Sequence, residues 1–194
     1  RVVTSDIKEA IGRVNKGELS IEELYEIERA ACSGAGICNM MGTANTMCAV
    51  VEAAGLSLPG NATVDAVLPT LGDRAAPRAH PQLLGLAFEA GRHAVQAQRE
   101  GRSFRAVCGL ATLHNMVRVV QALGGSTNLV LHLLALGAEL GVPLSLDDWD
   151  QLGRETPLLT RLKPASEYTV SDFGQAGGVM ALLRELYPLL DVDV

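Results

Sequence analysis

Aromatic residues are scarce in this sequence, and long hydrophobic runs are missing. Phe, Trp and Tyr together make up 4% of the 194 residues. No apolar stretch reaches the roughly 18 residues of a membrane-spanning helix, so we expect no membrane partner. Hydrophobic residues still reach 48%, and a chain of this length can bury one core, which Leu, Ala, Val and Met must fill. We therefore expect residues 1–194 to form a single domain or subdomain.

Positive charge is limited as well. The chain has 16 Lys and Arg against 22 Asp and Glu, which gives a net charge of −6, and no basic cluster occurs. Nucleic acids and anionic membranes attract proteins through clustered Lys and Arg side chains. The charge pattern therefore argues against nucleic acid as a partner.

Cysteine is rare too, and the four in the chain do not read as a disulfide framework. The opening "RVVTSDIKEA" lacks an initiator Met and the basic-then-apolar profile of a signal peptide, which indicates a chain trimmed at its front. Four cysteines without a disulfide framework favour a reducing compartment, so we expect a cytoplasmic location. Cys32 and Cys38 are spaced as C-x5-C, which matches no zinc ribbon, zinc finger or CxxC motif. Because the four histidines are scattered, no complete metal site is expected within this chain.

Helical signals dominate the rest of the sequence. Ser20 and Glu23 form a capping box, and glycines end several apolar helical patterns. The expected helices cover 21–31, 43–54, 81–100, 106–123, 126–140 and 176–187, with a short helix capped by Ser145 and Asp148 through Trp149. The run 126–140 is apolar on nearly every side, which indicates burial, and 156–164 is the best strand candidate. The predicted fold is mainly α, with at most a minor sheet.

Cys38 is the first candidate for chemistry. It follows a loop with two glycines, Gly34 and Gly36, and precedes an expected helix. The dipole and free N–H groups of a helix start favour the thiolate, which is the form that binds iron or zinc. The alternative is that Cys38 packs as a small hydrophobe, as we expect for Cys48 and Cys108 in their apolar helical runs. The sequence leaves both interpretations of Cys38 open.

The turn "LGGSTN" is the second candidate. Its two glycines permit close backbone approach, and Ser126, Thr127 and Asn128 bring polar side chains to a helix start. Such a site suits a carboxylate or a phosphate. The alternative is an ordinary turn between helices, in which Ser126 or Thr127 caps the second helix.

Three stretches resemble the family of dihydroxy-acid dehydratases and sugar-acid dehydratases, which includes 6-phosphogluconate dehydratase. They are "GICNMMGTANTMCAVVEAAGLSLPGNA", "ALGGSTNLVLHLLALGAELGVPLSLDDWDQL" and "TPLLTRLKPASEYTVSDFGQAGGVMALLREL". The resemblance implies the helical part of an α/β N-terminal domain. It also implies the loss of water from a 2,3-dihydroxy acid or sugar acid to give a 2-keto acid, with an iron-sulfur cluster (2Fe-2S or 4Fe-4S) and a nearby Mg²⁺. Cys38 resembles the third of three cluster cysteines, whereas Cys32 does not look like a ligand.

The sequence also departs from the family. The Cys-Asp-Lys signature, with two cluster cysteines and Mg²⁺ ligands, is absent, as are the Thr-Asp-Gly-Arg signature and the serine base. The chain therefore resembles the second half of the N-terminal domain, and alone we expect it to be inactive. Its expected partners are a small hydroxy-acid substrate, the remainder of its parent chain and further copies in a homo-oligomer.

Two other functions stay open at this stage. The first is a stand-alone, catalytically inactive helical binding module that diverged from the same family. The second is a redox sensor that uses Cys32 and Cys38.

Overall fold

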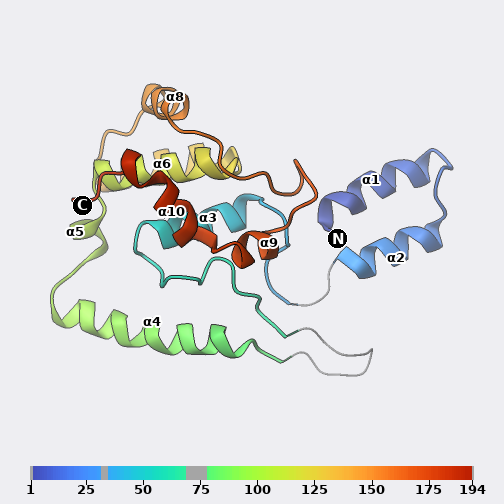
Figure 1. The fold of residues 1–194 in the computed structure, drawn as a ribbon, viewed down its shortest axis with the longest axis horizontal. Coiled ribbons are helices and arrows are strands. Elements are labelled where there is room, and N and C mark those ends of the chain that lie inside the picture. Colours follow the sequence, from blue (N-terminus) through green and yellow to red (C-terminus); the bar gives the residue numbers. More distant parts are fainter. Residues whose placement is uncertain (1, 32–34, 69–77, 194) are drawn as a thin grey trace.

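The computed structural model describes residues 2–31, 35–68 and 78–193 (Figure 1). In this part of the chain the fold is mainly α, as predicted. No sheet forms there, and the only strand-like pairing is an isolated antiparallel bridge between Val67 and Ala79.

The elements follow one another as short and medium helices. They are α1 (Thr4–Asn15), α2 (Ile21–Ala31), α3 (Thr43–Ala53), α4 (Pro81–Arg99), α5 (Phe104–Val107), α6 (Leu110–Leu123), α7 (Asn128–Leu140), α8 (Leu146–Glu155), α9 (Val170–Gln175), α10 (Gly178–Leu186) and a 3₁₀ turn, η1 (Tyr187–Leu189). The predicted helices at 21–31, 43–54, 81–100, 126–140 and 176–187 are confirmed to within two residues. α1, α5 and α9 were not expected from the sequence.

Two predicted capping boxes are confirmed. Ser20 N donates to the Glu23 carboxylate at 2.8 Å, and Glu23 N donates back to Ser20 Oγ at 3.1 Å. Ser145 and Asp148 exchange the same pair of bonds at 2.7 and 3.1 Å. Each pair satisfies backbone donors that a helix start leaves free, so these helices begin where the sequence indicates. The helix that Ser145 caps, α8, runs on to Glu155, well past Trp149.

α6 is the centre of the core. α3, α7, α8 and α10 all pack against it, and it buries more side chains than any other element of the described chain. The buried residues of α6 are Thr112, Leu113, Met116, Val117, Val119, Val120, Ala122 and Leu123. Because aromatic side chains are few, this aliphatic helix supplies much of the volume of the core.

The strand prediction for 156–164 is wrong. Leu159 N and Thr160 N both donate to the carbonyl of Ala122, at 2.8 and 3.1 Å, and Thr160 Oγ1 donates to Leu123 O at 2.8 Å. The segment is extended, but its partners are the free carbonyls at the end of α6 rather than another strand.

Two further expectations need correction. The predicted helix 106–123 is broken, because Cys108 is extended (φ −115°, ψ 96°) and α6 begins only at Leu110. α7 is also less buried than its composition indicates. Leu129 and Leu133 are fully buried, whereas Leu131 is 68% exposed. One apolar side of α7 is therefore left uncovered in this chain.

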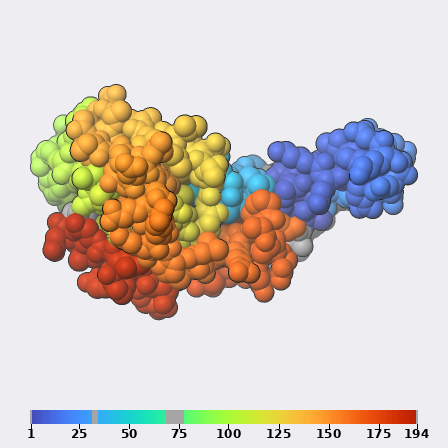
Figure 2. Space-filling view, turned by 90° about the horizontal axis from the view of Figure 1, so that it is seen from above, coloured from blue at the N-terminus to red at the C-terminus, as the bar shows by residue number. Residues whose placement is uncertain are grey.

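α1 and α2 pack on each other and project from the helical body (Figures 1 and 2). A salt bridge of 3.1 Å between Asp6 and Lys163 ties this hairpin to the segment before α9. The backbone N–H of Val3 donates to Asp6 at 2.7 Å. This hydrogen bond and, to a smaller extent, the hydrogen bond and charge of Lys163 lower the pKa of Asp6. The salt bridge therefore persists at neutral pH and weakens only as acid protonates the carboxylate.

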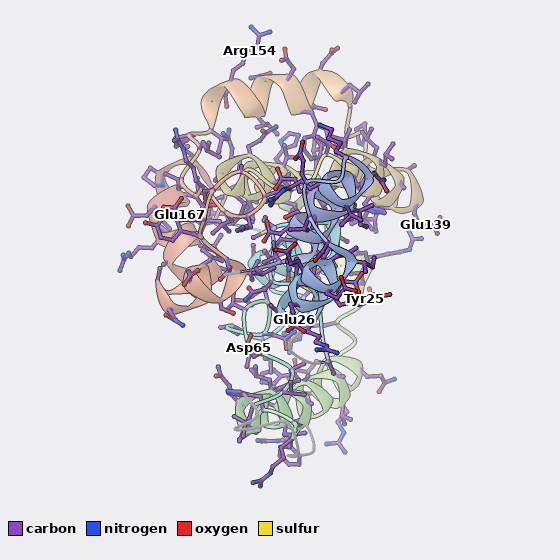
Figure 3. The ribbon with its side chains drawn as sticks, turned by 90° about the vertical axis from the view of Figure 1, so that its right-hand side faces the viewer. Tyr25, Glu26, Asp65, Glu139, Arg154 and Glu167 are labelled. Carbon is purple, nitrogen blue, oxygen red and sulfur yellow. The ribbon has the colours of Figure 1, made fainter. Side chains whose placement is uncertain are left out.

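α4 is the longest helix that the structure describes, and none of its residues is buried. It projects from the body in two perpendicular views (Figures 1 and 3). In the described chain, no helix has both the length and the apolar character needed to cross a membrane.

Candidate site at the start of α3

Cys38 lies in the segment that leads into α3, and its side chain is half-buried. α3 begins at Thr43, five positions further along, with Gly42 in the N-cap position. The thiol therefore sits ahead of the helix rather than on its cap. Cys32 lies outside the described residues, so the pairing of Cys32 with Cys38 in a redox role is not tested.

Asn45, in the first turn of α3, fixes residues 38–41, which we call the Cys38 segment. Its side-chain amide donates to Cys38 O at 2.5 Å and to Met40 O at 2.7 Å. Asn45 is only 5% exposed, so both amide hydrogens have protein partners away from bulk water. A buried side chain with two bonds to one segment determines the path of that segment, and hence where the thiol lies.

Two further contacts fasten the same segment to the C-terminal part of the chain. Asn39 and Ser171 exchange a reciprocal pair, in which Asn39 Nδ2 donates to Ser171 Oγ at 3.0 Å and Ser171 N donates to Asn39 Oδ1 at 2.9 Å. Met41 N donates to Lys163 O at 2.8 Å. The Cys38 segment is thus held both by α3 and by the C-terminal part of the chain.

The second predicted motif, the "GGSTN" turn, meets α3 directly. Gly124 ends α6 with φ +59°, a left-handed conformation that favours glycine. Ser126 N then donates to Thr46 Oγ1 at 3.1 Å. A Cβ atom on Gly125 would lie 2.5 Å from Thr46 Cγ2, so only glycine allows this approach of the turn to α3.

Thr43 joins the two motifs at the first residue of α3. Its hydroxyl lies 3.1 Å from Ser126 Oγ and accepts a hydrogen bond of 2.8 Å from Asn128 Nδ2. The first turn of α3 therefore carries one side chain bonded to the Cys38 segment and two bonded to the "GGSTN" turn. We refer to Thr43, Asn45 and Thr46 as the α3 polar turn.

The structure distinguishes the three polar residues of the turn. Ser126 has a structural role, since its hydroxyl also accepts from Asn128 N at 3.3 Å, and Asn128 bonds to Thr43. Thr127 occupies the N-cap position of α7 but makes no side-chain capping bond, and it is exposed. The alternative in which Thr127 caps α7 through its hydroxyl is therefore wrong.

A buried carboxylate, missed by the sequence analysis, shapes the neighbouring loop. Glu52 is 4% exposed and accepts from Gly60 N at 2.8 Å and from Ala62 N at 2.7 Å. Both of its oxygens therefore have backbone donors, which is what makes burial of an acid tolerable. The signal in the sequence was an acid inside an apolar helix, followed by the "LSLPGNA" loop.

This loop borders a polar cleft of about 290 Å³ that also includes the start of α4 and residues of α9 and α10. Asp65, labelled in Figure 3, lies on the stretch between α3 and α4. Ser171 Oγ donates to Asp65 Oδ1 at 3.3 Å, while Ser171 also pairs with Asn39. Asn39 and Ser171 thus connect the Cys38 segment to one wall of the cleft.

The described residues offer a single candidate thiol for a metal. Burial raises the pKa of Cys108, and burial followed by the charge of Glu52 raises the pKa of Cys48. Both side chains belong to the core or pack against it, which confirms the expectation that these two cysteines pack as small hydrophobes. No group of three or more His, Cys, Asp or Glu side chains in the described chain is arranged to hold a metal ion.

Comparison with known proteins gives the class to which this fold and site belong. A family model described as "Dihydroxy-acid/6-phosphogluconate dehydratase N-terminal" matches residues 2–194. The chain belongs to this family.

Particular relatives carry the name dihydroxy-acid dehydratase. The protein from Thermodesulfovibrio yellowstonii is 40% identical over 186 residues, which is 96% of this chain and 32% of the relative. The Roseiflexus sp. protein is 40% identical, over 95% of this chain and 31% of its own length. That from Chloroflexus aurantiacus is 41% identical, over 92% and 30% respectively. The chain thus spans about a third of the curated relatives it matches.

We predict that Asn45→Asp disrupts the Cys38 segment. Aspartate would face the carbonyls of Cys38 and Met40 with acceptors instead of donors, so the variant should lose about 2–4 kcal/mol of unfolding free energy at pH 7. The rate at which a thiol reagent labels Cys38 should also change. Chemical denaturation and labelling followed by mass spectrometry measure the two effects.

Asn61→Asp is the matched control, because Asn61 is exposed and its side-chain amide donates to Ser57 Oγ, at 2.9 Å, rather than to a buried backbone carbonyl. It should stay within about 0.5 kcal/mol of the native protein. Equal effects of the two substitutions would show that Asn45 does not hold the Cys38 segment.

Proposed function

We propose that the protein carrying this chain removes water from a 2,3-dihydroxy acid or sugar acid to give a 2-keto acid. The single observation that supports this most strongly is the family match over residues 2–194, together with relatives of 40% identity named dihydroxy-acid dehydratase. Residues 1–194 would then form part of an N-terminal domain. The substrate, the remainder of the parent chain and further copies of it would be its partners, in the cytoplasm.

Cys38 is the proposed ligand of an iron-sulfur cluster. Its thiol is free and half-buried in a segment fixed by Asn45, whereas Cys48 and Cys108 pack with the core. When bound, such a cluster supplies a Lewis acid for the hydroxyl that leaves. An iron-sulfur centre held by protein thiolates requires several of them. The described residues fit one ligand only, so the other cysteines, the Mg²⁺ ligands and the base would come from outside the described part of the chain.

The "GGSTN" turn is the proposed contact for the substrate, most naturally for its carboxylate. Thr127 is exposed at the start of α7, a helix of 13 residues whose dipole favours a negatively charged group at that end. The α3 polar turn brings this helix start and the Cys38 segment to the same end of α3. In this arrangement Ser126 and Asn128 set the shape of the pocket and Thr127 donates to the ligand.

A stand-alone, inactive binding module is less well supported. Such a module would have no need for a free, half-buried cysteine in a segment fastened by Asn39, Asn45 and Met41. The family match extends over nearly the whole chain, and the relatives it matches are named as dehydratases.

Replacement of Cys38 tests the ligand assignment. In the full-length protein, Cys38→Ser should abolish the iron-sulfur absorbance and lower the bound iron and sulfide, because the serine hydroxyl is a poor substitute for a thiolate. Cys48→Ala and Cys108→Ala are the controls and should retain the cluster. Retention of a full cluster in Cys38→Ser, together with its loss in Cys32→Ser, would contradict the assignment.

Thr127 tests the substrate site. Thr127→Ala and Asn128→Ala in the full-length enzyme should lower kcat/KM at least tenfold, a loss of about 1.4 kcal/mol of transition-state stabilisation. Thr127 makes no intramolecular side-chain bond in the described structure, so its variant should keep the native melting temperature, and Thr127→Ser should restore activity. Unchanged kinetics in Thr127→Ala would make the turn a structural element only.

A further inference from the structure

Lys163 joins the start of α1 to the Cys38 segment. Its ammonium lies 3.1 Å from both carboxylate oxygens of Asp6, in the first turn of α1. Its carbonyl accepts the hydrogen bond of 2.8 Å from Met41 N, and its own N–H donates to Tyr168 O at 2.6 Å. One residue thus contacts three parts of the chain, through its side chain, its carbonyl and its amide.

A second contact runs directly from α1 to the same segment. Thr4 Oγ1 donates to Met40 Sδ at 3.3 Å. Val3, in the N-cap position of α1, is buried, and so is Met41. Figure 2 shows the hairpin of α1 and α2, in blue, meeting the body near the orange part of the chain that precedes α9. The start of α1 therefore reaches the Cys38 segment by two routes, one through Lys163 and one through Thr4.

The ion pair of Asp6 and Lys163 is shielded from water. Its side chains are 28% and 18% exposed. By contrast, Arg105 and Glu139, which also pair across distant parts of the chain, are 62% and 80% exposed. Removing two charges from water offsets much of their attraction, so a shielded pair is weak evidence for a role in stability. What this pair does fix is the position of Lys163 relative to α1, and with it the carbonyl that holds Met41.

We infer that Lys163 is a positioning residue for Cys38, because its ammonium is fixed on Asp6 while its carbonyl holds Met41. Asn45 binds the other carbonyls of the Cys38 segment from α3, and Lys163 binds its last N–H from the opposite part of the fold. Together they determine where the thiol lies. The role of that thiol as a cluster ligand rests on the proposed function, whereas its placement by Lys163 does not.

Thiol labelling tests the placement without the cluster. In the full-length protein, before any cluster is reconstituted, Lys163→Met should change the rate at which a maleimide labels Cys38 by about threefold or more. Lys163→Arg still pairs with Asp6 and should restore the native rate. Arg105→Met removes the exposed pair with Glu139 and is the matched control, which should label at the native rate. Mass spectrometry of the peptide that contains Cys38 measures each rate.

Asp6→Asn is the second variant, and it decides the question if Lys163→Met fails to fold. Its amide oxygen still accepts from Val3 N, so α1 begins as before, but the ion pair is lost. It should change the labelling of Cys38 in the same way. Labelling of Cys48, measured in the same samples, should keep its native rate, since a general opening of the fold would expose both thiols.

The reconstituted cluster gives a spectroscopic measurement. In the full-length protein, Lys163→Met and Asp6→Asn should alter the electron paramagnetic resonance spectrum of the reduced cluster, and Arg105→Met should not. Native labelling of Cys38 or a native spectrum in both variants would overturn the inference, as would equal changes in the control. Altered labelling in a protein that takes up no cluster would support the inference and contradict the proposed function.

Discussion

The hydrogen bonds of the α3 polar turn are the constraint on which the candidate site depends. A helix start leaves backbone donors free, and the side chains of its first turn point in different directions around its axis. In α3 these side chains are directed to two different segments, with Asn45 bonded to the residues around Cys38 and Thr43 and Thr46 bonded to the "GGSTN" turn. Residues some 80 positions apart are thereby brought together, and the close approach at Gly125 leaves little room for another arrangement.

The aliphatic core supports the place where the Cys38 segment and the "GGSTN" turn meet α3. α6 packs against α3 and α7, and its C-terminal end is fixed by the extended segment through the carbonyls of Ala122 and Leu123. At Gly124 the chain leaves α6 and enters the "GGSTN" turn. The position of the "GGSTN" turn is therefore coupled to the best-buried helix of the described chain. By contrast, α4 and one side of α7 remain uncovered, which fits a chain that spans about a third of its relatives.

Local signals in the sequence predicted the helices and both candidate motifs, because capping boxes and terminal glycines act within a few residues. They could not predict that Cys38 and Ser126 share one helix start, since that depends on side-chain bonds across the fold. The strand prediction failed for the same reason: the pattern of 156–164 indicates an extended chain, but not that its partner is the end of α6. Glu52 was missed because its role depends on two backbone donors in a loop.

The central claim is that the Cys38 segment and the "GGSTN" turn form one unit through α3. A double-mutant cycle on unfolding free energy with Thr43→Ala and Asn128→Ala measures the coupling across their 2.8 Å hydrogen bond. The account predicts a coupling energy of about 0.5–1.5 kcal/mol, as expected for residues in direct contact. Additive effects, with a coupling below about 0.3 kcal/mol, would contradict it.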